Sequence, residues 1–201
     1  MKLFILKNGK IIFSTSREAM KTEPEPALSE KGKQQSKYVA KRLAHLQITK
    51  VYVSNAQRAL ETYAAYKQIR PSVPVVMSDK LKEIYRGVVG GPPRKGTSRN
   101  REKNDKQRAK AILKKILNDA QEDDAILLFI HGNLIRYILA YFLQISKANL
   151  WEELEIHDAS ISLIDITNNK PQVRLINSIE HLGKEEVEEF YNAYTKTEYL
   201  P

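Results

Sequence analysis

His131 and Gly132 carry the clearest chemical signal in this chain of 201 residues. They follow an unbroken apolar run, Ala125–Ile130, which indicates a strand buried on both faces of a parallel sheet. Beyond them, apolar residues recur at helical spacing over residues 134–143. The pair therefore lies at a strand-to-helix junction, where open α/β sheets bind ligands and backbone N–H groups favour anions. The stretch predicts either a histidine poised for phosphate chemistry or a polar residue that only closes a core strand.

Two other predicted strands also end in polar residues. Lys7 and Asn8 close the first apolar run of the chain, and Arg58 follows the second, which covers residues 48–53. The carboxyl ends of parallel strands meet at the same edge of a sheet. Polar residues thus follow three predicted strands, and ligands of open α/β sheets bind beyond the carboxyl ends of the strands.

The order of the predicted elements indicates a three-layer α/β/α sandwich. Strands and helices alternate through the central histidine, which favours a mostly parallel sheet with right-handed crossovers and helices on both faces. Two late runs of alternating residues, at 160–166 and 172–177, predict a β-hairpin and so a late antiparallel edge. Early in the chain a local alternative stays open, since Asn8 with Gly9 is also a hairpin turn signal toward residues 11–13.

A glycine-rich and then basic segment interrupts this order. Residues 94–115 hold ten basic and two acidic residues, with apolar residues at helical spacing among them. We interpret residues 86–122 as a loop plus basic helix inserted over the site of a single domain that spans residues 1–201, and we expect residues 87–104 to be mobile. Such a charge run is usually a solvated face, although it also allows binding of nucleic acid or another polyanion.

The composition bounds the partners and the compartment. The chain carries 33 Lys and Arg against 24 Asp and Glu, a net charge of +9, which suits phosphorylated metabolites, nucleic acid or an anionic membrane surface. Cysteine is absent, which excludes disulfides, thiol catalysis and a zinc–thiolate site. No apolar segment approaches the ~20 residues of a membrane span. We therefore expect a cytoplasmic protein without a membrane partner.

The polar strand ends belong to a series of five short motifs in a fixed order. They are Lys-Asn-Gly at 7–9, Leu-Ser-Glu-Lys-Gly at 28–32, Ser-Asn-Ala-Gln-Arg-Ala-Leu-Glu-Thr at 54–62, Leu-Lys-Glu at 81–83, and His-Gly at 131–132. Together they resemble the motifs of the histidine phosphatase superfamily, which includes cofactor-dependent phosphoglycerate mutases and many phosphatases. The resemblance covers nearly the whole chain and implies a phosphoglycerate mutase-like fold.

The resemblance also implies roles for individual residues. In the family a histidine at the end of the first strand attacks phosphorus, basic groups hold the phosphoryl oxygens, and a carboxylic acid protonates the leaving oxygen. It puts Glu83 in the acid role and His131 beside the phosphorus, with neither metal nor cofactor. The implied phosphate-binding residues are Lys7, Arg58, His131, Gly132 and Asn133.

The sequence departs from the family at the position that carries the reaction. Asn8 stands where the family has its nucleophilic histidine, and Lys7 stands where the family has an arginine. The amide of asparagine cannot replace imidazole as a nucleophile, and lysine lacks the bidentate fork of arginine. We therefore expect a degenerate active site that binds phosphate or a small phosphorylated molecule, with weak or no hydrolysis.

Two other functions remain open from the sequence. One is an active phosphatase in which His131 serves as nucleophile or Glu83 activates a water molecule. The other is a polyanion- or nucleic-acid-binding module that uses residues 94–115, although no nucleic-acid motif accompanies this segment. The sequence allows a homodimer and does not identify the phosphorylated ligand.

Overall fold

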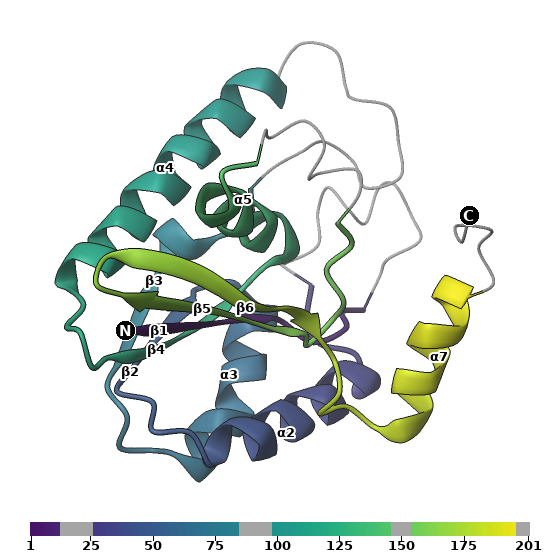
Figure 1. The fold of residues 1–201 in the computed structure, drawn as a ribbon. Helices are drawn as coiled ribbons and strands as arrows, with labels where there is room; N and C mark the ends of the chain where they lie inside the picture. The colour runs from purple at the N-terminus through teal and green to yellow at the C-terminus, as the bar shows by residue number, and fades with distance from the viewer. Residues whose placement is uncertain (13–25, 85–97, 146–153, 196–201) are drawn as a thin grey trace.

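The computed structural model describes residues 1–12, 26–84, 98–145 and 154–195 of the chain. Its six strands are β1 (Lys2–Lys7), β2 (Lys50–Ser54), β3 (Val75–Ser78), β4 (Ala125–Ile130), β5 (Ile161–Thr167) and β6 (Lys170–Ser178). They form one sheet in the order β3-β2-β4-β1-β5-β6, shown in Figure 1. The first four strands of this order run parallel to one another, and β5 and β6 add the antiparallel part.

Helices cover both faces of the sheet, so the expected α/β/α sandwich is confirmed (Figure 1). The helical elements are α2 (Glu30–Ala44), α3 (Gln57–Ile69), the short η1 (Asp79–Leu81), α4 (Ser98–Asp119), α5 (Gly132–Leu143) and α7 (Lys184–Thr195). On one face α2 and α3 bury residues such as Leu43 and Tyr66. On the other face α4 and α5 bury residues such as Leu113 and Ile138.

The hairpin suggested by Asn8 and Gly9 is wrong. The strand β1 pairs with β4 on one side and β5 on the other, and Ile11 makes only an isolated bridge to Leu28. The side chains of residues 3–6 are all buried, so β1 needs cover on both faces and a neighbour on each edge. That demand places β1 near the middle of the sheet and overrides the local turn signal.

The late hairpin is confirmed. Strands β5 and β6 pair in antiparallel fashion and are joined by a tight turn at Asn168 and Asn169. Both asparagines have positive φ, 51° and 58°, which matches the right-handed twist of a two-residue hairpin turn.

In the segment 86–122 the helix begins earlier than the sequence interpretation expected. Residues 85–97, most of the expected loop, lie outside the described residues, but α4 already begins at Ser98. Residues 98–104 are therefore helical, and the expectation of a mobile loop up to residue 104 is wrong there. The helix buries Ala109, Ile112 and Ile116 against the sheet side of the core, which anchors it to the fold.

Candidate functional site

Three strand ends bring Asn8, Ser54 and His131 into direct contact. His131 follows β4 and is only 1% exposed. Its Nδ1 lies 2.9 Å from the Asn8 Oδ1, and its Nε2 lies 2.8 Å from the Ser54 Oγ. An amide oxygen only accepts hydrogen bonds, so Nδ1 carries the ring proton and Nε2 accepts from the Ser54 hydroxyl. Both ring nitrogens of His131 are thus held by the protein.

Burial keeps the imidazole of His131 neutral. Loss of solvent lowers its pKa well below the usual range, and the positive charges of Arg58, Arg108 and Lys7 lower this pKa further. Arg58 stands at the start of α3, close enough to affect both His131 and Glu83 electrostatically. The structure therefore brings Arg58 close to His131, as the family resemblance implied.

Asn8 is fixed by its surroundings as firmly as His131. Its side-chain Nδ2 donates to the carbonyl of Gly9 at 2.9 Å, while its Oδ1 accepts from His131. Its backbone N–H donates to Ile130, and its carbonyl accepts from Ala159. The residue is only 5% exposed. The Asn8 amide thus forms hydrogen bonds within the protein through both its nitrogen and its oxygen.

The carboxylate of Glu83 caps the start of α5. Its two oxygens accept from the backbone N–H groups of Asn133 at 3.2 Å, Leu134 at 2.9 Å and Ile84 at 3.0 Å. Burial raises the pKa of Glu83, and these N–H groups together with Arg58 act in the opposite direction. The N–H of Asn133, which the sequence suggested for phosphate, is thus donated to Glu83.

Arg108 holds the segment that carries Glu83, a role that sequence reasoning missed. One terminal nitrogen of Arg108 donates to the carbonyls of Lys80 at 2.7 Å and Lys82 at 2.8 Å, and the other donates to the carbonyl of Glu83 at 3.0 Å. Asp105, one turn earlier on α4, pairs with the same guanidinium at 3.0 Å. Nothing in the sequence distinguishes Arg108 from its basic neighbours, because its partners are backbone carbonyls.

Lys7 is tied to the segment that leads into β5. Its Nζ forms an ion pair with Asp158 at 2.9 Å and donates to the carbonyl of Ile156 at 2.6 Å. A side chain on Gly132 would lie 3.6 Å from the Lys7 stem, so Lys7 also borders the start of α5. Asp158 is a second residue that sequence reasoning missed, since it lies in no motif.

The motif at 28–32 positions the loop that follows β1. Ser29 caps α2 by accepting from the N–H of Gly32 at 3.1 Å, and its own N–H donates to the carbonyl of Lys10 at 2.9 Å. A Cβ on Gly32 would lie only 2.1 Å from that carbonyl oxygen. Glycine is therefore required because the loop lies directly on the first turn of α2.

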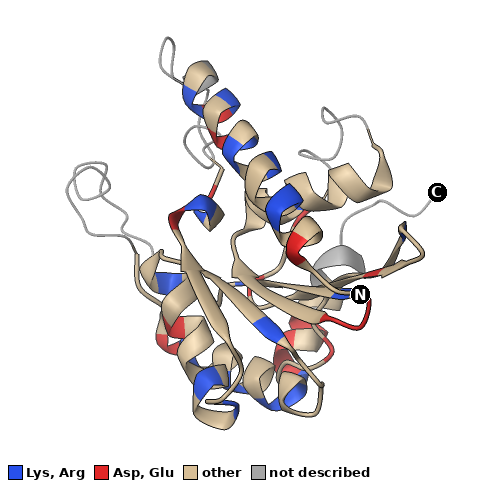
Figure 2. Cartoon of the chain, turned by 90° about the vertical axis from the view of Figure 1, so that its left-hand side faces the viewer, with Lys and Arg blue, Asp and Glu red and all other residues tan. Residues whose placement is uncertain are grey.

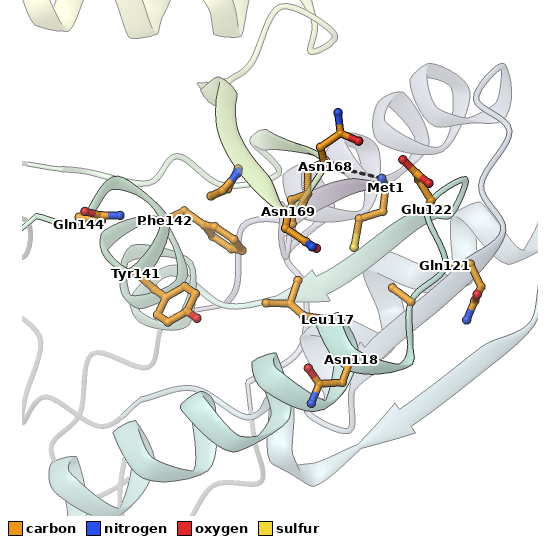
Figure 3. Close-up of a pocket in the computed structure, with 13 residues that line it drawn as sticks. Met1, Leu117, Asn118, Gln121, Glu122, Tyr141, Phe142, Gln144, Asn168 and Asn169 are labelled. Atoms are coloured by element: carbon orange, nitrogen blue, oxygen red, sulfur yellow. Dashed lines mark hydrogen bonds between the residues drawn. The ribbon is translucent and has the colours of Figure 1, made fainter.

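The structure places all seven sequence-predicted site residues at the carboxyl edge of the sheet. They are Lys7, Asn8, Arg58, Glu83, His131, Gly132 and Asn133. A cavity of about 800 Å³ lies at the other edge, before β1 and β4, and Figure 3 shows its lining. That lining contains neither lysine nor arginine; it mixes apolar side chains with amides such as Asn118 and Asn169, and includes the carboxylate of Glu122. It is therefore poorly suited to phosphate and separate from the strand-end site.

Comparison with known proteins agrees with this fold. The sequence pattern of the histidine phosphatase superfamily (branch 1) matches residues 9–179. A probable phosphatase of Schizosaccharomyces pombe is 23% identical over 204 residues, which covers 92% of this chain and 97% of that protein. Bacillus stearothermophilus YhfR has a similar structure, with a TM-score of 0.71 at 20% identity over 90% of this chain and 99% of that one.

A phosphoserine phosphatase from Entamoeba histolytica, solved with 3-phosphoglyceric acid, gives a TM-score of 0.68 at 19% identity over 90% of this chain and 99% of that chain. The fold and the strand-end site thus define a phosphoglycerate mutase-like α/β protein. The chain belongs to the histidine phosphatase superfamily, as its motifs indicated.

Two further findings concern metals and membranes. Among the described residues, no group of three or more His, Asp or Glu side chains is placed to hold a metal ion. Within the same part of the chain, every helix is too short or too polar to cross a membrane.

Proposed function

We propose that this protein binds phosphate or a small phosphomonoester at the strand-end site, with hydrolysis weak or lost. The observation that carries the proposal is the Asn8 amide, which stands where the family resemblance puts the nucleophile and is hydrogen-bonded to His131 at 2.9 Å. A family reaction through phosphohistidine needs a ring nitrogen with a free lone pair at that position. The amide has none to offer.

The alternative of an active phosphatase with His131 as nucleophile is less well supported. The Nε2 of His131 accepts the Ser54 hydroxyl at 2.8 Å, and the ring is almost completely buried. Attack on phosphorus requires this lone pair to leave Ser54 and reach the substrate. Direct attack by water with Glu83 as base would likewise require Glu83 to leave its three N–H donors.

Binding is supported by the basic groups that remain. Arg58 and Lys7 border the site, and the whole chain carries a net charge of +9 that draws anions toward it. The S. pombe relative is a probable phosphatase, and the E. histolytica neighbour was solved with 3-phosphoglyceric acid. These neighbours favour a small phosphorylated ligand here too. A cytoplasmic location and a homodimer stay predictions from the sequence.

Thermal unfolding with added phosphate or sulfate tests the binding. A ligand that binds only the folded state stabilises it by RT ln(1 + [L]/Kd), about 2.7 kcal/mol at a hundredfold excess over Kd. We expect both anions to raise the melting temperature and Arg58→Ala to abolish most of the rise. Arg174→Ala, on the exposed strand β6, is the matched control and should keep the wild-type shift. An equal shift in wild type and Arg58→Ala would place the anion site elsewhere.

A second candidate function rests on the charge of α4. The sequence of this helix holds eight basic and three acidic residues, a net charge of +5. Lys103, Lys110 and Lys114 are exposed and share one face of the helix at helical spacing. Figure 2 shows the basic residues along α4, the long helix on the side turned toward the viewer. This face is suited to a polyanion, independently of the strand-end site.

A further inference from the structure

The carboxylate of Glu83 occupies backbone donors that an anion at the strand-end site would use. We propose that this site takes up its oxyanion together with a proton, because an ionised Glu83 and a bound oxyanion compete for the N–H groups at the start of α5. The inference rests on the proposed function and adds a regulation of the same site by pH.

The geometry makes the competition direct. The N–H groups of Asn133 and Leu134 point at Glu83 over 3.2 and 2.9 Å. Each N–H has one hydrogen, so a hydrogen bond to a bound oxyanion weakens or replaces the one to the carboxylate. Two anions at this distance also repel each other, and burial weakens the screening of that repulsion. Protonation of Glu83 removes both obstacles and turns its acid group into a donor.

Among the charged and titratable groups around Glu83, we expect only Glu83 itself to change its protonation state. Arg58 on α3 and Arg108 on α4 face it, and guanidinium groups stay protonated at every pH of interest. His131 at the end of β4 is kept neutral by burial, and Lys7 on β1 is engaged by Asp158. Burial raises the pKa of Glu83 above that of a free glutamate, which makes its protonation easier.

Arg108 fixes the backbone around Glu83, so that only the carboxyl side chain can move when an anion competes for the N–H groups. Its three donations hold the carbonyls of Lys80, Lys82 and Glu83, so the backbone that carries Glu83 is anchored to α4. Only the side chain of Glu83 is then left to withdraw when an anion binds. The site can open by rotation of one side chain, without movement of a helix.

Calorimetric titration with sulfate over about pH 5 to 8 tests this directly, because sulfate stays a dianion throughout and does not titrate itself. Uptake of one proton per anion lowers the affinity by about tenfold for each pH unit above the pKa of Glu83. We expect this slope in the wild type, and tighter, nearly pH-independent binding in Glu83→Gln. Glu30→Gln removes an equal charge from the exposed first turn of α2 and should retain the wild-type slope.

The outcomes are distinguishable. Sulfate binding by the wild type with no dependence on pH overturns the inference and leaves the proposed function standing. Absence of binding in both wild type and Glu83→Gln contradicts the proposed function and this inference with it. If Glu83→Gln does not fold, the wild-type slope against pH, compared with that of Glu30→Gln, still decides between a proton-linked and an unlinked site.

Discussion

His131 is held at both ring nitrogens, and this fact governs the chemistry of the site. Asn8 fixes which nitrogen carries the proton, and Ser54 engages the other one. We propose that Asn8 stands where the family has the histidine that bonds to phosphorus. Here an amide at that position and a neutral, buried imidazole beside it form a closed hydrogen-bond network. These contacts hold Asn8, Ser54 and His131 in place relative to one another.

A first prediction concerns Gly32, where close packing against the loop after β1 leaves no room for a side chain. Gly32→Ala puts a Cβ at 2.1 Å from the carbonyl oxygen of Lys10, so backbone has to move. We expect the free energy of unfolding to fall by roughly 1 to 3 kcal/mol, measured by urea denaturation. Gly183→Ala is the matched control, because its Cβ would meet only the end of the Tyr38 side chain at 3.4 Å. Equal stabilities of the two variants would contradict the close approach.

At the scale of elements, much of the fold and of the site could be predicted from the sequence. Short apolar runs predict the buried strands, and the alternation of strands with helices restricts the fold to a few topologies. The motifs then place Arg58, Glu83 and His131 at one edge of the sheet, where the structure has them. Strand ends are predictable because each one closes an apolar run.

Other features depend on contacts that local sequence does not encode. Asn8 and Gly9 carry a hairpin signal, yet β1 pairs with strands more than a hundred residues away. The start of α4 is polar for about three turns, so no apolar stripe marks it before Ala109. The role of Arg108 depends on the positions of backbone carbonyls, and the pattern of side chains in the sequence does not predict those positions.

The exposed basic face of α4 leads to a prediction at this scale. Replacing Lys103, Lys110 and Lys114 together with serine should weaken binding to random oligonucleotides and flatten its dependence on salt, since each lost phosphate contact removes about 0.9 from the slope. The sulfate-induced rise in melting temperature should remain, because these side chains lie away from the strand-end site.

The matched control for that variant replaces three exposed lysines on one face of α2, Lys33, Lys37 and Lys41. It lowers the net charge equally and should leave oligonucleotide affinity nearly unchanged. If both triple variants lose affinity to the same extent, the net charge of the chain is responsible and the polyanion function of α4 is contradicted.

At the scale of the whole molecule, buried titratable groups set how stability depends on pH. Burial lowers the pKa of His181 to about 4, and its Nε2 donates to the carbonyl of Ala159 at 3.0 Å. Between this value and the ordinary histidine pKa of about 6.5, the unfolded chain binds more protons than the folded one. Stability therefore falls as the pH drops through this window. Glu83, whose pKa is raised, contributes with the opposite sign.

His181→Gln tests this account of acid sensitivity. The glutamine amide can still donate to the Ala159 carbonyl, but it does not titrate. We expect urea denaturation to show a smaller loss of stability between about pH 6.5 and 4 than in the wild type. His45→Gln, at an exposed position after α2, should retain the wild-type dependence. A His181→Gln profile parallel to the wild type would show that this histidine does not contribute.

We propose that Asn8 replaces the family's nucleophile while the rest of the site keeps its geometry. The most direct measurement is hydrolysis of a generic phosphomonoester by the wild type, by Asn8→Ala and by the double variant Lys7→Arg with Asn8→His, together with detection of phosphohistidine. We expect the wild type to match Asn8→Ala, with little hydrolysis and no phosphohistidine. The double variant should gain measurable activity, because histidine supplies the attacking nitrogen and arginine the bidentate clamp. Robust wild-type hydrolysis that survives Asn8→Ala and is lost in His131→Ala would contradict the claim and identify His131 as the nucleophile.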